Sequence, residues 1–178
     1  MTAWSFHATG KLFSSGGSFE VVGDTGQPVA TVELTSGRIG RATWAWTGPS
    51  PRWSLAAPGM FRRTYTLTVD GLAAPVKIHT SGTVRPKLAA VLADGREFRA
   101  APTAGVDREL DLVLDDQQVA HLTRATTSRD QQWTSREHWV LTFAASVEPE
   151  TLTVEARAVV EAATVMIDQR RRQREGQD

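Results

Sequence analysis

The sequence contains no cysteine. Disulfides, thiol nucleophiles and cysteine-ligated zinc sites are therefore excluded. Lysine is also scarce, because only Lys11, Lys77 and Lys87 accompany the arginines, and this arginine-rich and alanine-rich composition is typical of GC-rich bacterial genes. With 178 residues, 40% of them hydrophobic, the chain is long enough to fold as a single domain (residues 1–178) around one apolar core.

Neither sign of charge is in excess, since twenty basic residues balance twenty acidic ones. Binding to nucleic acid depends on a surplus of basic side chains, so this balance argues against a nucleic-acid partner. Residues 1–17 hold no apolar run preceded by positive charge, and no stretch reaches the roughly 18 apolar residues that span a bilayer. We therefore expect a cytoplasmic protein with no transmembrane span. Peripheral binding at the inner face of the membrane is compatible with this expectation.

The sequence motifs of common enzyme sites are also missing. The glycine-rich phosphate loops, the G-x-S-x-G nucleophile motif and the H-E-x-x-H metal motif do not occur. Four histidines, His7, His79, His121 and His138, are scattered singly without the spacing of metal ligands. Of these, His121 and His138 lie on different predicted strands and could meet in space. The sequence thus predicts no catalytic, cofactor-binding or metal-binding residue, no cofactor and no enzyme activity.

From about residue 10 to residue 145 the sequence reads as β-rich runs separated by short turns. Aspartate and glycine tolerate the left-handed backbone of a tight reversal, so Asp24–Gln27, Asp70-Gly71 and Asp94-Gly95 mark hairpins. A further turn is predicted at Asp115–Gln118. The clearest runs cover residues 18–23, 28–35, 60–69, 88–93, 97–101, 109–114, 119–124 and 138–144. This spacing predicts on the order of ten antiparallel strands in a sandwich or barrel, a mainly β fold.

After Pro149 the pattern becomes helical, and we expect a helix over about residues 150–172 followed by a short basic, polar tail. On a helical wheel its polar residues form a stripe about 80° wide, and an arc of about 240° is apolar. Such a helix is buried, and because no second helix is predicted, the strands must cover it. The sequence therefore predicts a barrel wrapped around a single hydrophobic C-terminal helix. The polar stripe consists of Thr153, Arg157, Glu161, Thr164 and Asp168.

The same apolar arc has a second interpretation as a membrane span. Two charged residues, Arg157 and Glu161, lie inside the segment. Each costs roughly 2.5 to 3.5 kcal/mol at the centre of a bilayer, and few leucine, isoleucine or phenylalanine residues offset that cost. The barrel interpretation is therefore favoured.

Two groups of side chains have both a functional and a structural interpretation. Trp44 and Trp46, with Trp53 close by, could form an exposed platform for a ligand, but packing around the helix is favoured. Asp107, Glu109 and Asp111 alternate with other residues and could hold a cation or act as an acid/base pair. The same alternation is typical of the solvated face of a strand, which is the favoured interpretation.

Clusters of basic residues are candidates for contact with anionic lipid. Arg170-Arg171-Arg172 and Arg174 finish the predicted helix, where cations also complement the helix dipole. Arg62-Arg63 and Arg85-Pro86-Lys87 are weaker candidates for the same role. Each basic residue near an anionic membrane surface adds about 1 kcal/mol to binding.

Two segments resemble the tubby C-terminal-like superfamily, which includes LURP-one-related proteins and phospholipid scramblases. The hairpin of residues 19–30, with its Asp24-Thr25-Gly26 turn, is similar to a strand–turn–strand unit of that group. Trp139–Phe143, followed by Pro149, Leu152 and a helix closing at Ile167-Asp168, resembles its last strand and helix. The resemblance implies a twelve-stranded barrel around a hydrophobic helix.

The resemblance does not extend to the functional residues of those families. Ala144–Val147 replaces the acidic stretch that is proposed to bind calcium in scramblases, and palmitoylated cysteines are lacking. The basic lipid-binding residues of tubby domains have no residue-by-residue counterpart here. Calcium dependence and lipid scrambling are therefore not expected.

Three functions remain as hypotheses, and the first is favoured. It is a non-catalytic binding module that engages a protein partner or an anionic lipid headgroup at a membrane surface, with ligand-binding residues not identified. The alternative is a barrel that carries a small apolar ligand, with its helix outside. The third is an enzyme with a site assembled from scattered acidic residues and histidines.

Overall fold

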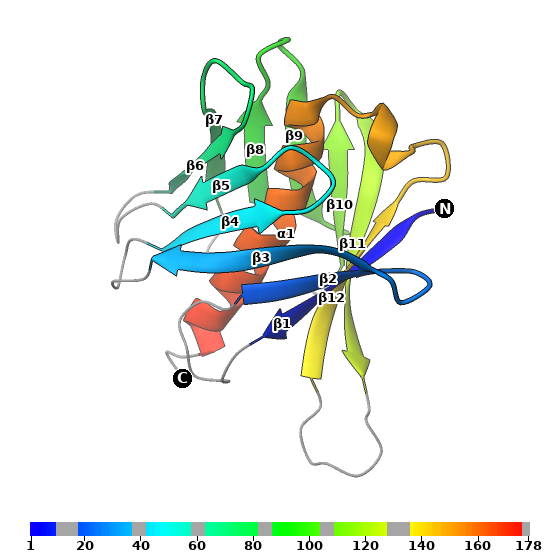
Figure 1. Cartoon of the computed structure of the whole chain (residues 1–178). Helices are drawn as coiled ribbons and strands as arrows, with labels where there is room; N and C mark the ends of the chain where they lie inside the picture. The colour runs from blue at the N-terminus through cyan, green and yellow to red at the C-terminus, as the bar shows by residue number, and fades with distance from the viewer. Residues whose placement is uncertain are drawn as a thin grey trace.

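The computed structural model describes residues 1–9, 18–36, 42–57, 63–81, 87–103, 109–127 and 136–175. Within them, twelve antiparallel strands form a closed barrel in which every strand pairs with its neighbours in the chain and β12 pairs with β1 (Figure 1). The strands are β1 (Ala3–Thr9), β2 (Ser18–Gly23), β3 (Pro28–Ser36), β4 (Thr43–Thr47), β5 (Trp53–Ala56), β6 (Thr64–Val69), β7 (Val76–Ser81), β8 (Lys87–Val91), β9 (Glu97–Pro102), β10 (Glu109–Leu114), β11 (Gln117–Thr127) and β12 (Arg136–Phe143). The predicted fold class, an antiparallel barrel with a single C-terminal helix, is confirmed.

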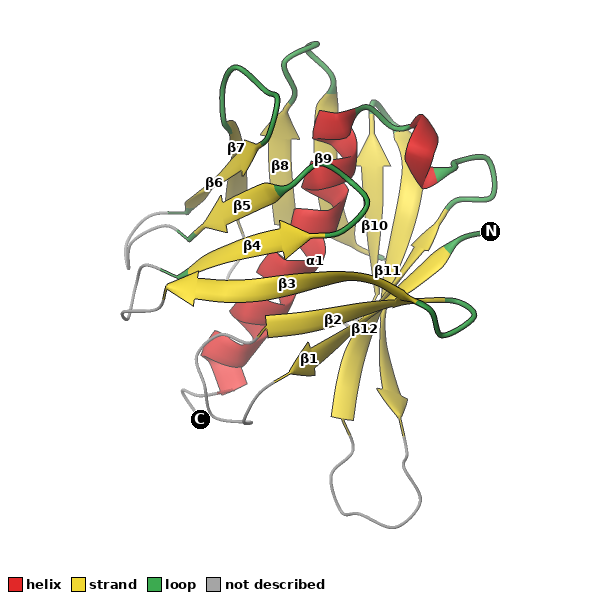
Figure 2. Cartoon of the chain, viewed as in Figure 1, coloured by secondary structure: helices red, strands yellow, loops and turns green. Residues whose placement is uncertain are grey.

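The helix α1 (Val154–Glu175) runs through the barrel, as the cartoon coloured by secondary structure shows (Figure 2). Every residue from Ala156 to Asp168 except Arg157 is buried. A helix that is buried on all sides by strands confirms the interpretation drawn from its wide apolar arc. In the polar stripe, Glu161, Thr164 and Asp168 are buried too, whereas Arg157 is half-buried and Thr153 is exposed.

The strands alternate between core and solvent with a period of two, as half-buried strands do. In β7, for example, Val76, Ile78 and Thr80 are buried, whereas the residues between them are exposed. The inward side chains pack on α1, whose small residues Ala162 and Ala163 have no exposed surface. Small side chains on the helix therefore let the barrel wall approach it closely.

The structure corrects three predicted boundaries. The barrel begins at Ala3 rather than near residue 10, because β1 pairs with both β2 and β12. Pro149 opens a separate 3-10 helix, η1 (Pro149–Thr151), and α1 starts only at Val154. The reversal predicted over Asp115–Gln118 is a tight turn in which Leu114 lies opposite Gln117. Asp115 and Asp116 both have positive φ, at 47° and 63°, which a two-residue hairpin turn of this hand requires.

The two ends of the barrel differ in what closes them. The turns after β2, β4, β6, β8 and β10, together with η1, gather at one end, which we call the hairpin end (Figure 1). The helix enters the barrel there. The Ala93 backbone N–H donates a bifurcated hydrogen bond to the two carboxylate oxygens of Glu155, each at 3.0 Å, and Arg96 donates to Thr153 Oγ1 at 3.0 Å. These bonds fix the start of α1 to the β8–β9 turn.

Candidate functional site

A buried polar cluster joins α1 to the loop between β4 and β5 and to β5 itself. Trp53 Nε1 donates to Glu161 Oε2 at 2.8 Å, Ser50 Oγ donates to Oε1 at 3.1 Å, and Arg157 Nε donates to Oε1 at 3.0 Å. Both carboxylate oxygens of Glu161 are therefore occupied by protein donors. Burial raises the pKa of Glu161, against the opposing effects of the Trp53 N–H and the Arg157 charge.

Aromatic rings complete this cluster. The Arg157 guanidinium lies 5.1 Å from the centre of the Trp4 ring, in the geometry of a cation–π contact. Trp46 stacks on Trp53 with 5.6 Å between the ring centres, and Trp46 Nε1 donates to Ser50 Oγ at 3.0 Å. Further along the helix, Trp139 Nε1 donates to Asp168 Oδ1 at 3.2 Å.

These contacts make the buried cluster a structural clamp rather than a ligand site. Its carboxylate is saturated with donors and has no exposed surface that a substrate could reach. The burial of the tryptophans also decides whether they pack in the core or form an exposed platform. Trp44, Trp46 and Trp53 are each at most 2% exposed, so packing is confirmed and a platform built from these three residues is wrong.

A second polar cluster lies on the outside of the barrel, across β10 and β11. His121 Nδ1 lies 2.8 Å from Asp111 Oδ1, which also accepts from Gln118 Nε2 at 2.9 Å. Thr103 Oγ1 donates to the other Asp111 oxygen at 3.3 Å. Glu109 Oε2 is 3.8 Å from His121 Nε2, so the imidazole sits between two carboxylates. Asp107, the third member of the predicted acidic row, lies outside the described residues.

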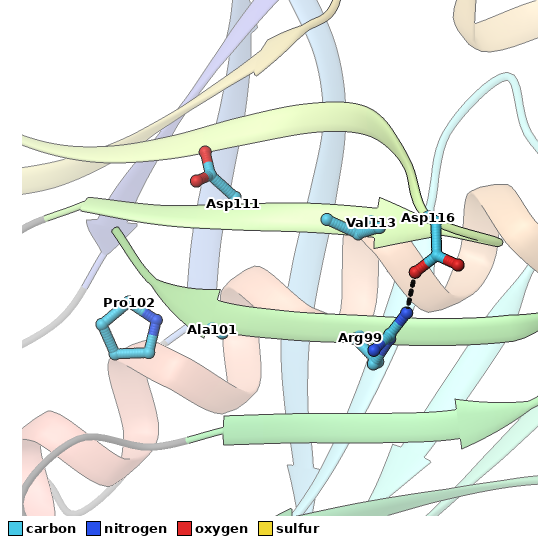
Figure 3. Close-up of a pocket in the computed structure, with 6 residues that line it drawn as sticks. All are labelled: Arg99, Ala101, Pro102, Asp111, Val113 and Asp116. Carbon is cyan, nitrogen blue, oxygen red and sulfur yellow. Dashed lines mark hydrogen bonds and ion pairs between the residues drawn. The ribbon is translucent and has the colours of Figure 1, made fainter. Parts of the chain in front are cut away.

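Beside Asp111, an open hollow of about 390 Å³ lies over β9 and β10 (Figure 3). Asp111 and Pro102 border it on one side, and the ion pair between Arg99 and Asp116 borders it on the other. Ala101 and Val113 contribute apolar surface between them. One cation and two carboxylates give the hollow a net negative charge, which does not suit a phosphate group.

The Asp111 cluster includes one hydroxyl, on Thr103, which donates to Asp111. Among the described residues, no group of three or more histidine and acidic side chains is arranged to hold a metal ion. His121 and His138 do not meet, because His121 lies opposite Thr142 on β12 and His138 lies opposite Ala125 on β11.

The outer face of β6, β7 and β8 carries exposed basic side chains. We call this surface the basic face and define it by Arg63, Lys77, His79 and Lys87. Lys77 lies opposite Thr66 on β6, His79 lies opposite Thr64, and Lys87 lies opposite Ser81 on β7. None of the residues in β6, β7 or β8 is acidic. On β8, Ala89 and Val91 are also exposed, Val91 to 65%.

The hairpin end, by contrast, is acidic. Its turns and the segment leading into α1 hold seven acidic residues and two basic ones, Arg52 and Arg96. The acidic residues are Asp24, Asp70, Asp94, Asp115, Asp116, Glu148 and Glu150. The described hairpin end is therefore net acidic, although the full chain has twenty residues of each sign.

The predicted basic clusters are only partly described. Arg63 and Lys87 belong to the basic face, whereas Arg62, Arg85 and Pro86 lie outside the described residues. Arg170-Arg171-Arg172 and Arg174 are helical residues of α1, and their side chains are not described. The exposed Lys77 and His79 were not predicted from the sequence as part of a binding surface. Their signal was the Lys-x-His alternation of β7.

Comparison of the chain with protein-family models, with curated proteins and with solved structures finds no match. In the described part of the chain, α1 is not apolar enough over its length to cross a membrane, and no other helix is. The function must therefore be argued from the geometry of the surface.

Proposed function

We propose that this protein is a non-catalytic binding module whose basic face engages an anionic phospholipid surface. The observation that carries the proposal is the basic face itself, where Lys77 and Lys87 are exposed on strands that contain no acidic residue. Cations held this way attract anionic headgroups, and the exposed Val91 beside them adds apolar contact.

The acidic hairpin end supports an orientation for this binding. An anionic surface repels the acidic hairpin end and attracts the exposed lysines of the basic face. The barrel then lies with its hairpin end away from the lipid. This orientation agrees with a bacterial cytoplasmic protein that binds at the inner membrane face.

The architecture supports a tubby-like assignment within the same proposal. A twelve-stranded barrel around a buried C-terminal helix is the fold that the resemblance to tubby-like and LURP-one-related proteins implies. The carrier alternative requires the helix to lie outside the barrel, whereas α1 occupies the interior. We therefore do not propose an apolar carrier.

The test is co-sedimentation with vesicles of phosphatidylcholine, with and without phosphatidylserine, at increasing salt. We expect binding only to the phosphatidylserine vesicles, weakening as salt screens the charges. Lys77→Ala and Lys87→Ala are each expected to weaken binding about fivefold, the equivalent of about 1 kcal/mol per cation.

The matched control is Arg52→Ala, which removes one exposed cation from the hairpin end. It is expected to bind like the parent protein. Absence of binding to phosphatidylserine vesicles, or equal losses in all three variants, would contradict the lipid proposal. A protein partner would then become the favoured ligand of this module.

A further inference from the structure

We infer that His7 and His138 form a two-histidine site for a divalent transition-metal ion, on the outer surface of the seam that closes the barrel. The seam is the pairing of β1 with β12, the first and last strands of the chain. This inference is independent of the basic face, which lies on β6–β8.

The backbone register brings the two histidines together. Phe6 lies opposite Trp139, so one step further His7 faces His138 across the seam. Phe143 N donates to Thr2 O at 2.9 Å, which fixes the alternation of hydrogen-bonded and non-hydrogen-bonded pairs along these two strands. Counting from that bond, His7 and His138 occupy a non-hydrogen-bonded pair, the position in which opposite side chains are closest.

The side chains have the proximity that a shared metal requires. Phe6 and Trp139 point into the core, so His7 and His138 point outward, and both are partly exposed. Their rings stack with 4.5 Å between centres and 19° between planes. A shared metal ion requires one nitrogen of each ring to turn toward a common point above the seam.

The surrounding charge favours a cation. Glu20 lies opposite His7 on β2 and is exposed, which places a carboxylate next to the pair. Among the described residues, no group of three or more histidine and acidic side chains is arranged to hold a metal ion, so we expect water to complete the coordination sphere. Imidazole is a preferred ligand of Cu²⁺, Ni²⁺ and Zn²⁺, and affinity for such a site follows the order in which Cu²⁺ binds most tightly.

A metal held here would join the two ends of the folded chain. It would bind only the folded barrel, because β1 and β12 are more than one hundred residues apart in sequence. Binding to the folded state alone raises the apparent stability by mass action. The site is therefore a means by which a metal ion could stabilise the closing seam.

The experiment is titration of the full chain with CuCl₂, NiCl₂ and ZnCl₂, followed by calorimetry and by thermal unfolding. We expect saturable binding near one ion per chain, a rise in Tm, and an affinity order with Cu²⁺ first. His7→Ala and His138→Ala should each weaken binding about a hundredfold, because either change turns a two-point attachment into a one-point attachment.

Controls separate this site from weak binding to single histidines. His79→Ala and His121→Ala remove imidazoles that lie away from the seam and should leave the affinity unchanged. In case His7→Ala disturbs the fold, the parent protein is also studied by NMR with substoichiometric Ni²⁺, which should broaden the ring signals of His7 and His138 first. The inference is overturned by an absence of saturable binding, by equal losses in all four variants, or by uniform broadening of the four histidines.

Discussion

A carboxylate with no exposed surface must be stabilised by the groups around it, and at Glu161 those groups come from three segments. Trp53 is on β5, Ser50 is in the preceding turn, and Arg157 lies one helical turn earlier on α1. Removing one partner of a buried ion pair leaves the other uncompensated, which is costly. The clamp therefore fixes how far α1 is inserted and how it is rotated in the barrel.

We expect Glu161→Gln to destabilise the protein by about 1 to 3 kcal/mol, because an amide NH2 in place of Oε1 cannot accept the hydrogen bonds from Ser50 Oγ and Arg157 Nε and leaves these buried donors unpaired. The effect should depend on pH. The folded-state pKa of Glu161 is raised above its ordinary value of 4.5. The stability that this shift contributes is fully present below the ordinary value and is lost as pH rises through the folded-state pKa.

The stability difference between the parent protein and Glu161→Gln should therefore grow as pH is lowered toward 4.5. Urea unfolding at several pH values measures it. Glu33→Gln, an exposed position on β3, is the control and should leave both stability and its pH dependence unchanged. A difference that shrinks as pH falls would contradict the assignment of a raised pKa.

The members of the clamp were visible in the sequence, but their meeting was not. The polar stripe of α1 and the paired tryptophans of β4 are both apparent from spacing. Trp53 and Glu161, however, are 108 residues apart, and only the register of the barrel brings them into contact. The same holds for His121 with Asp111, because a one-residue slip between strands would turn one of them inward.

At the scale of the element, α1 was the most predictable part of the fold. A helix with a wide apolar arc must be buried, and in a chain with a single helix only the strands can cover it. The start of the helix was predicted less well. Proline is favourable in the first turn of a 3-10 helix as well as of an α-helix. The sequence therefore does not indicate that η1 ends at Thr151 before α1 begins.

The tight fit around α1 predicts sensitivity to added volume. Ala163 is completely buried, so Ala163→Val should destabilise the protein by about 1 to 3 kcal/mol through overpacking. Val154→Ile, at the exposed start of the same helix, adds volume where there is space and should be nearly neutral. Thermal and urea unfolding of the two variants provide the comparison. Equal stability of both variants would show that α1 is not tightly enclosed.

At the scale of the whole molecule, the strands follow one another around the barrel in chain order. Turn signals were therefore enough to predict about how many strands there are and that they are antiparallel. Closure of the barrel was harder to predict from the sequence. It depends on the pairing of β1 with β12, and the turn pattern did not reveal β1. The acidic character of the hairpin end can be recognised only in the folded structure, because it depends on which turns lie at the same end of the barrel.

The most direct test of the account is amide hydrogen exchange along α1, measured by NMR under native conditions. A helix sheathed by a closed barrel can exchange only when the whole structure opens. The account predicts that the amides of residues 156–168 exchange as slowly as the most protected amides of β11 and β12. Rapid exchange along α1 while those strands stay protected would place the helix outside the barrel and contradict the account.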